Sequence, residues 1–195
     1  MTTRTVTGLY DSYDAASRTV RDLEAANIPD SDISIVAHES TGGAAVGAGT
    51  GASAGAVIGG GAGLLAGLGI LAIPGVGPVV AAGWLVATAV GAVAGAAAGG
   101  ATGGLIGSMT SAGVSRDDAD FYAEGVRRGG SLVTARVDET QVATAELIMK
   151  RHGRIDRAAR ELAYRDSGWR GFDEKSLPYT PAEIQRERLL YQDRR

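Results

Sequence analysis

The 195-residue chain contains no cysteine and only two lysines, and its net charge is −3. Without cysteine it cannot form disulfides, thiolate zinc sites or iron–sulfur clusters, and it has no cysteine nucleophile. Because the lysines are Lys150 and Lys175, neither follows the glycine-rich region as a nucleotide-binding P-loop requires. The slightly acidic balance provides no basic surface for nucleic acid. We therefore expect no cofactor and no nucleic-acid partner.

Charge is also missing from a long central stretch. Residues 40–115 form 76 consecutive positions without a charged side chain, so the 19 basic and 22 acidic residues all lie in the other 119. The same stretch holds 23 of the 30 glycines. This partition predicts four parts: 1–40, the first half of an α/β domain; 41–114, a glycine-zipper hairpin; 115–167, the second half; and 168–195, a tail.

The first half has the pattern strand, helix, strand. Residues 4–10 are β-branched and threonine-rich, which favours a strand, and they lack the apolar core of a secretory signal, so we expect a cytoplasmic domain. Asp11 or Ser12 can cap the helix that follows, and Asn27 can end it. Residues 33–37 form the second strand. The expected buried stripe of the helix consists of Tyr13, Ala16, Val20 and Leu23.

The second half predicts helix, strand, helix and a weak last strand. Ser115 caps a helix over residues 116–128, residues 131–137 alternate as a strand, and Asp138 caps the next helix, with Gln141 in capping-box position. Residues 154–156 are the candidate edge strand. The expected buried positions of the two helices are Ala119, Tyr122, Val126, Val142, Ala145 and Met149.

Without the central stretch and the helix after it, the order is β-α-β-β-α-β. The predicted fold class is therefore α+β: a ferredoxin-like split βαβ domain, interrupted by a long glycine-zipper antiparallel helical hairpin. In the tail, Thr180, Pro181 and Glu183 predict a short helix, since they provide an N-cap, a first-turn proline and a capping-box acid. That helix is either solvated or docked through Ile184, Leu189 and Tyr191.

Glycines repeat every fourth residue in two runs on either side of a turn at residues 74–78. On a helix this period places them along one face, where the missing side chains allow close helix packing. The sequence tolerates the helix-weakening cost of glycine many times over, which favours a packing role. The predicted helix-packing residues are Gly43, Gly47, Gly51, Gly55, Gly59, Gly63 and Gly67 in the first run and Gly91, Gly95, Gly99, Gly103 and Gly107 in the second.

A dinucleotide-binding loop and a disordered linker both fit the glycines less well than helix packing. The G-x-G-x-x-A spacings at residues 61–66 and 67–72 do not follow a strand, and no acidic residue lies near twenty positions later to hold a ribose. A disordered linker is usually rich in serine and proline, whereas this stretch is rich in leucine, isoleucine and valine.

The hairpin can lie in lipid or be buried in protein. Including their small-residue ends, both arms exceed about twenty uncharged residues and can span a bilayer. The arginines that follow the exit then place both termini in the cytoplasm. The alternative is a soluble homo-oligomer in which the hairpins of several copies bundle. The expected partners are thus the chain itself and a lipid bilayer.

The flanking regions resemble the general stress protein 17M-like (heat-induced stress protein) family of bacterial α/β domains. The matching stretches are residues 6–10 leading into the helix at 11–27, then 33–36, 129–134 (GGSLVT), 150–153 (KRHG) and 168–173 (GWRGFD). The resemblance implies a stress-linked protein and provides no catalytic residues. The long insertion departs from the simplest members of the family.

Few residues can perform chemistry. His38 and His152 lack the spacing of a metal site, and the acidic pairs at 117–118 and 173–174 suit a helix cap and a solvated surface. We therefore expect no catalytic, cofactor-binding or metal-binding residue. The hypothesis is a non-enzymatic stress-response protein whose hairpin mediates membrane association and self-assembly; the alternatives are a soluble homo-oligomer and a ligand-sensing ferredoxin-like module.

Overall fold

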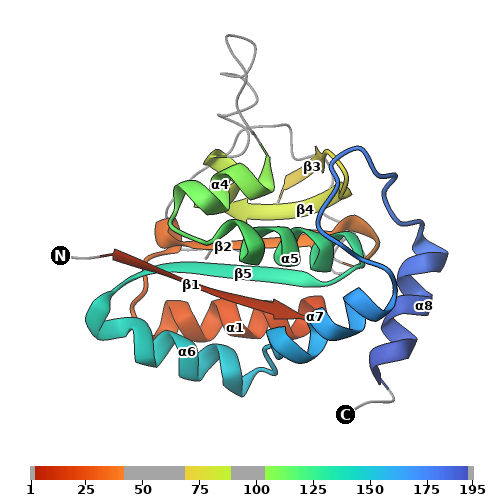
Figure 1. Ribbon diagram of the computed structural model, residues 1–195. Coiled ribbons are helices and arrows are strands. Elements are labelled where there is room, and N and C mark those ends of the chain that lie inside the picture. Colours follow the sequence, from red (N-terminus) through yellow and green to blue (C-terminus); the bar gives the residue numbers. More distant parts are fainter. Residues whose placement is uncertain (1–2, 42–68, 89–103, 193–195) are drawn as a thin grey trace, which may run out of the picture.

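In the computed structural model, the described parts of the chain are residues 3–41, 69–88 and 104–192. They form an α+β fold around one antiparallel sheet with the strand order β1-β5-β2-β4-β3 (Figure 1). The five strands are β1 (Thr3–Tyr10), β2 (Ile33–His38), β3 (Gly69–Ile73), β4 (Gly77–Gly83) and β5 (Ser131–Asp138).

Helices cover both faces of the sheet (Figure 1). One face packs on α1 (Tyr13–Ala25) and α6 (Val142–Arg151), and the other on α4 (Leu105–Ser111) and α5 (Arg116–Arg127). The alternation of β5 serves both cores, because Val133 belongs to the first and Leu132 to the second. Two further helices, α7 (Arg157–Asp166) and α8 (Pro181–Gln192), follow in the chain, and short 3-10 turns occupy Asp30–Asp32 and Glu139–Gln141.

The predicted strand, helix and strand over residues 4–37 are confirmed as β1, α1 and β2. Ser12 caps α1 by accepting a hydrogen bond from the Ala15 backbone N–H at 3.2 Å. Asn27 has a left-handed φ of 61°, as expected of the residue that ends a helix. The stripe is buried as predicted, and it comprises Tyr13, Ala16, Val20 and Leu23.

The second half is confirmed in its strand and two helices but not in its last strand. Ser115 caps α5, whereas α6 begins after a 3-10 turn and receives no side-chain cap from Asp138. Residues 154–156 are not a strand: the Ile155 N–H donates to the Leu9 carbonyl at 2.8 Å, and α7 begins at once because Asp156 caps it. The cap at Asp156 thus turns the chain into a helix where a strand would have extended the sheet.

The structure has a turn at residues 74–76, within the predicted 74–78, but the described residues directly before and after it form strands, not helices. Gly69–Ile73 and Gly77–Gly83 are the paired strands β3 and β4, and β4 also pairs with β2. The predicted helical arms are therefore wrong over these residues. Tertiary pairing decides the matter, because β4 places Val79 and Ala81 in the core with α4 and α5. Among the described residues no helix has the length and apolar character needed to cross a membrane.

The inserted stretches connect elements of this one sheet. Both β2 and β3 run antiparallel to β4, so they are parallel to each other with β4 between them. Residues 42–68 link the end of β2 to the start of β3, and residues 89–103 link a helical turn at 84–88 to α4. Each inserted stretch therefore begins and ends on the same folded body.

Candidate functional site

Most of the predicted helix-packing glycines lie outside the described residues. Gly43 to Gly67 of the first run fall in 42–68, and Gly91 to Gly103 of the second fall in 89–103. Gly107 is described and lies half-buried within α4. Around it, α4 buries Leu105, Ile106 and Met109 in the core shared with α5 and the sheet. The described end of the second run thus packs on the domain.

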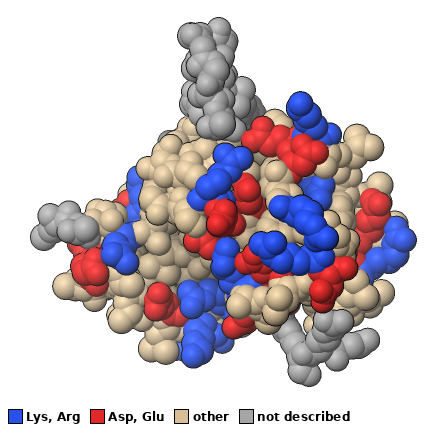
Figure 2. Space-filling model, viewed as in Figure 1, with Lys and Arg blue, Asp and Glu red and all other residues tan. Residues whose placement is uncertain are grey.

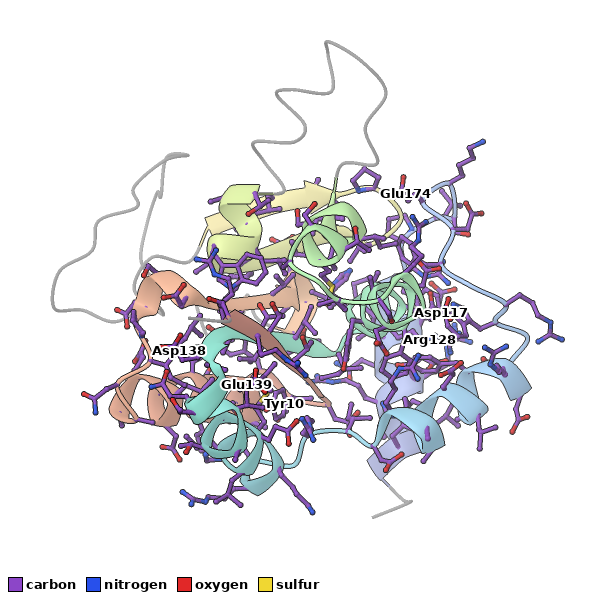
Figure 3. The ribbon with its side chains drawn as sticks, turned by 60° about the vertical axis from the view of Figure 1, so that its left-hand side comes forward. Tyr10, Asp117, Arg128, Asp138, Glu139 and Glu174 are labelled. Atoms are coloured by element: carbon purple, nitrogen blue, oxygen red, sulfur yellow. The ribbon has the colours of Figure 1, made fainter. Side chains whose placement is uncertain are left out.

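A network of charged side chains joins α5 to the C-terminal helix α8. Glu124 on α5 is fully buried and accepts hydrogen bonds from Arg127 at 2.9 Å and from Arg128 at 2.6 Å. Arg128, at the C-terminal end of α5 (Figure 3), also contacts both carboxylate oxygens of Glu187 on α8 at 3.2 Å. Two acids and two arginines thereby neutralise one another where α8 meets the domain.

The cost of burying Arg128 is offset by its partners. Burial lowers the pKa of the Arg128 guanidinium, but the neighbouring charge and hydrogen bond of Glu124, with Glu187 and Tyr179, raise that pKa above its ordinary value. The guanidinium carbon also lies 4.4 Å from the ring centroid of Tyr164, a cation–π contact. Burial raises the pKa of the Tyr164 hydroxyl, so this ring stays neutral beneath the cation.

A second ion pair lies beside the first. Arg160 of α7 binds the carboxylate of Asp11, at the end of β1, through two hydrogen bonds of 2.9 and 3.2 Å. Its guanidinium carbon lies 3.7 Å from the ring centroid of Tyr191 on α8. Arg188 of α8 donates to the Asp11 backbone carbonyl at 3.3 Å. The helices α7 and α8 are therefore held to the end of β1 by planar, directional contacts.

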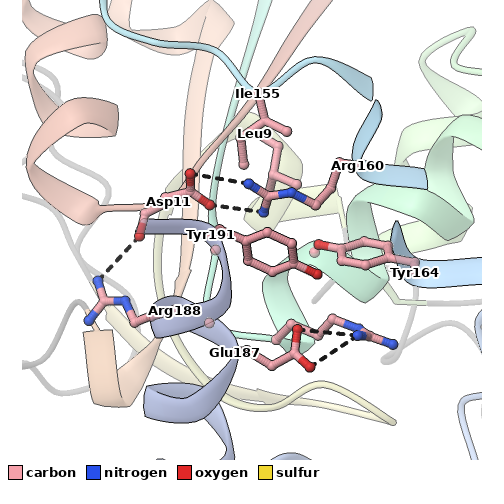
Figure 4. A pocket seen from close by; sticks show the side chains of 12 residues that line it. Leu9, Asp11, Ile155, Arg160, Tyr164, Glu187, Arg188 and Tyr191 are labelled. Carbon is pink, nitrogen blue, oxygen red and sulfur yellow. Dashed lines mark hydrogen bonds and ion pairs between the residues drawn. The ribbon is translucent and has the colours of Figure 1, made fainter. Parts of the chain in front are cut away.

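Figure 4 shows the small cavity that these residues enclose, with Arg160, Tyr164 and Tyr191 around it. The cavity holds about 10 Å³, which is room for about one water molecule. A wider concavity of about 530 Å³ opens beside it and shares Asp11, Arg160 and Tyr191. Because the charged groups facing the small cavity already bind one another, the arrangement is suited to docking α8 rather than to attacking a substrate.

Neither histidine forms a metal site with other described residues. His152 pairs with Asp22 at 2.8 Å, joining α6 to α1, and His38 contacts Ser40 through Nδ1. Burial lowers the pKa of His38. The Asp118 carboxylate accepts a hydrogen bond from the hydroxyl of Ser115, which caps α5 by accepting from the Asp118 N–H. The Asp173 carboxylate accepts hydrogen bonds from the Lys175 N–H and the Ser176 hydroxyl. Across 3–41, 69–88 and 104–192, no three histidine or acidic side chains come together as metal ligands.

The docking interpretation of the C-terminal helix is confirmed for two of its three residues. Ile184 is fully buried and Tyr191 is half-buried, but Leu189 is 60% exposed. Sequence reasoning missed Glu124 and considered Asp11 only as a helix cap, since an acidic residue carries no sign in the sequence of a distant arginine partner. The structure also explains Gly129, because a Cβ at this position would contact Ile184, but the sequence alone does not link the two residues.

No protein family model matches this chain, and neither a curated protein nor a solved structure matches it. The candidate site is therefore defined by its own geometry. That geometry is a docking surface for α8 held by paired charges, set on a folded domain that carries two uncharged, glycine-rich insertions.

Proposed function

We propose that this is a non-enzymatic bacterial stress-response protein whose glycine-rich insertions mediate self-assembly of its α+β domain. The partition of charge is the observation that carries the proposal. The described surface in Figure 2 bears interspersed acidic and basic side chains, whereas residues 42–68 and 89–103 contain none. In these stretches glycine recurs at every fourth position among alanine and branched apolar residues. On helices this pattern is suited to close helix–helix contact. The stress role rests on the resemblance of the flanking regions to the general stress protein 17M-like family.

A ferredoxin-like origin of the domain is part of the proposal. The strand order β1-β5-β2, with α1 connecting β1 to β2 and β5 inserted between them, supports a split βαβ unit. The hairpin of β3 and β4 then extends this sheet beyond β2. Ferredoxin-like domains bind small effectors in some proteins, which keeps a ligand-sensing role as a second candidate.

Membrane association is the other candidate, and length disfavours a full crossing. Because both ends of 42–68 are held in one sheet, a crossing would have to return to the side that it left. Half of its 27 residues would span about 20 Å as helix, at about 1.5 Å per residue, against a hydrocarbon core of about 30 Å. The shorter 89–103 is more limited still. This favours contact between copies over a spanning hairpin with both termini in the cytoplasm.

The test compares glycines in and out of phase. Gly59→Leu and Gly95→Leu alter the proposed contact faces, and we expect them to reduce oligomer size in analytical ultracentrifugation. The matched controls Gly60→Leu and Gly100→Leu lie one and five positions further along the chain, out of phase with the runs, and should keep the wild-type size. Equal behaviour of the two pairs would refute the packing role. Recovery of the wild-type protein in membranes after a salt wash would instead favour lipid as the partner.

A further inference from the structure

A second concavity lies on the face of the sheet covered by α4, far along β1 from the docking site of α8. It opens between the start of β1, the end of β5 and α4, and measures about 550 Å³. This volume is within the range of small-molecule sites, about 300–1,000 Å³. Hydroxyl groups dominate its rim, contributed by Thr3, Thr5, Thr88, Ser108 and Ser111.

The indole of Trp84 lines this groove with an unused donor. Trp84 is 8% exposed, and its Nε1 is buried without a hydrogen-bond partner among the described residues. A buried N–H that has given up water without gaining a protein acceptor is unfavourable. An oxygen atom supplied by a bound molecule would satisfy it.

Arg136 lies against the same indole and is held in place. Its guanidinium carbon is 4.8 Å from the Trp84 ring centroid, and its Nη2 contacts the Ser31 carbonyl at 3.0 Å and the Asp32 carboxylate at 2.8 Å. Its Nε is buried without a partner in the described chain. The groove thus offers a second unused donor, while Asp32 balances the positive charge.

Two threonines on the same face of the sheet add to this set. Thr7 and Thr134 face each other in register on β1 and β5, two residues beyond the groove-lining Thr5 and Arg136, so their side chains lie on the groove's face. Both hydroxyls are buried and unpartnered within the described residues. Four of the nine such buried polar atoms in the described chain therefore belong to residues that line this groove or lie next to it on the strands: Thr7, Trp84, Thr134 and Arg136.

We propose that this groove binds a small, uncharged, polyhydroxylated molecule of the sugar or polyol class. The two N–H donors bind ligand oxygens. The hydroxyls of Thr5, Thr88 and Ser108 already donate to backbone carbonyls, so they accept from ligand hydroxyl groups, whereas those of Thr3 and Ser111 can both donate and accept. Because Asp32 already neutralises Arg136, the groove has no net charge among its described lining residues that would favour an anion. This inference goes beyond the proposed function, since neither the groove nor its ligand depends on contact between copies.

Calorimetric titration of the full-length protein with glucose, trehalose and glycerol tests the proposal, with sodium phosphate and sodium acetate as anionic probes. We expect saturable binding of at least one of the uncharged probes. Trp84→Phe keeps an aromatic ring but removes the N–H, and it should weaken that binding at least tenfold. Trp169→Phe is the matched control, because Trp169 is also 8% exposed with an unpartnered Nε1 but lies in the aromatic cluster with Tyr164.

Each contrary outcome is distinct. No binding of any uncharged probe at millimolar concentration would overturn the proposal. Binding of phosphate or acetate alone would show an anion site instead. Unchanged binding by Trp84→Phe would place the ligand elsewhere. An equal loss of binding in Trp169→Phe would show a general loss of structure and would contradict a specific role for the Trp84 N–H. Oligomer size, measured on the same samples, is expected to stay the same, which separates this test from that of self-assembly.

Discussion

At the scale of single residues, Glu124 is the carboxylate on which the α5–α8 network depends. It is fully buried and binds two arginines, of which Arg128 is itself almost entirely buried. Glu124→Ala would remove the carboxylate that both arginines share and leave Arg128 with Glu187 alone, and breaking a buried pair from one side costs about 3–5 kcal/mol. We expect the free energy of unfolding, measured by urea denaturation, to fall by that amount.

The control for Glu124 is an ion pair in water. Arg116 is 56% exposed and pairs with Asp120 at 3.0 Å across one turn of the same helix. Arg116→Gln should change the free energy of unfolding by less than about 1 kcal/mol, because exposed pairs contribute little. Comparable losses in the two variants would argue against the importance of burial at Glu124.

Gly83 tests whether residues 77–83 are a strand. Its φ is +95°, and a Cβ at this position would collide with the Ile33 carbonyl oxygen on β2. Gly83→Ala should therefore lower stability by at least about 2 kcal/mol, since it combines a strained backbone with a clash. Gly69→Ala, at a strand glycine with nothing within 4 Å of a new Cβ, should be neutral or slightly stabilising. Thermal melts of both variants provide the comparison, and a harmless Gly83→Ala would contradict the pairing of β2 with β4.

The hydroxyl of Tyr10 predicts a loss of stability at high pH. Burial raises its pKa from 10.0 to about 12, so between these values the unfolded chain releases the proton first. The stabilisation is therefore complete below about pH 10 and is lost as the pH rises toward 12, at up to about 1.4 kcal/mol per pH unit. Tyr10→Phe should reduce this slope in urea titrations at pH 8 and 11. At pH 8 the variant should differ little, because the bond to the Met149 carbonyl is long, at 3.4 Å.

At the scale of elements, α8 is a docked helix with one buried anchor. Ile184 is fully buried, whereas Leu189 on the same helix is 60% exposed. Ile184→Ala should weaken docking by about 2–5 kcal/mol. Trypsin should then cleave faster after Arg186 and Arg188, and amide exchange in α8 should accelerate. Leu189→Ala should leave both rates unchanged; equal rates for the two variants would mean that α8 is solvated.

How far the sequence predicts these elements depends on whether the information is local. The stripe from Tyr13 to Leu23 and the alternation of residues 131–137 are local patterns, and the structure confirms them as α1 and β5. The hairpin of β3 and β4 was misassigned because the helical period of the two glycine runs was extended across residues 69–83, which contain none of the glycines of either run. Its strand identity comes from pairing with β2, a long-range contact.

The docking residues illustrate the same limit at the candidate site. Ile184 and Tyr191 were predictable because an apolar spacing on a capped helix indicates a buried face. The partners of Arg128 and Arg160 were not, since Glu187 and Asp11 lie 59 and 149 positions away in the chain. A charged residue looks alike in the sequence whether it is solvated or buried beside a partner. The groove at Trp84 likewise arises only when β1, β5 and α4 come together.

At the scale of the whole molecule, residues 3–41, 69–88 and 104–192 already provide a five-stranded sheet with a hydrophobic core on each face. This sheet and these cores are the reason to expect that the domain folds without the insertions. We expect that replacing 42–68 and 89–103 with flexible linkers of about 12 glycine and serine residues leaves a folded domain. Such linkers reach about 40 Å when extended, at about 3.3 Å per residue, more than the length of a five-residue strand.

The double replacement also separates folding from assembly. Its circular dichroism should show one cooperative melt, and sedimentation should show a monomer while the full chain sediments as a larger species. Replacing one insertion at a time then identifies which glycine run makes the contact. A replaced protein that melts without cooperativity would mean that the insertions belong to the fold. An unchanged oligomer would place the interface on the charged domain, and the exposed Leu189 and Leu190 of α8 would be the first positions to substitute.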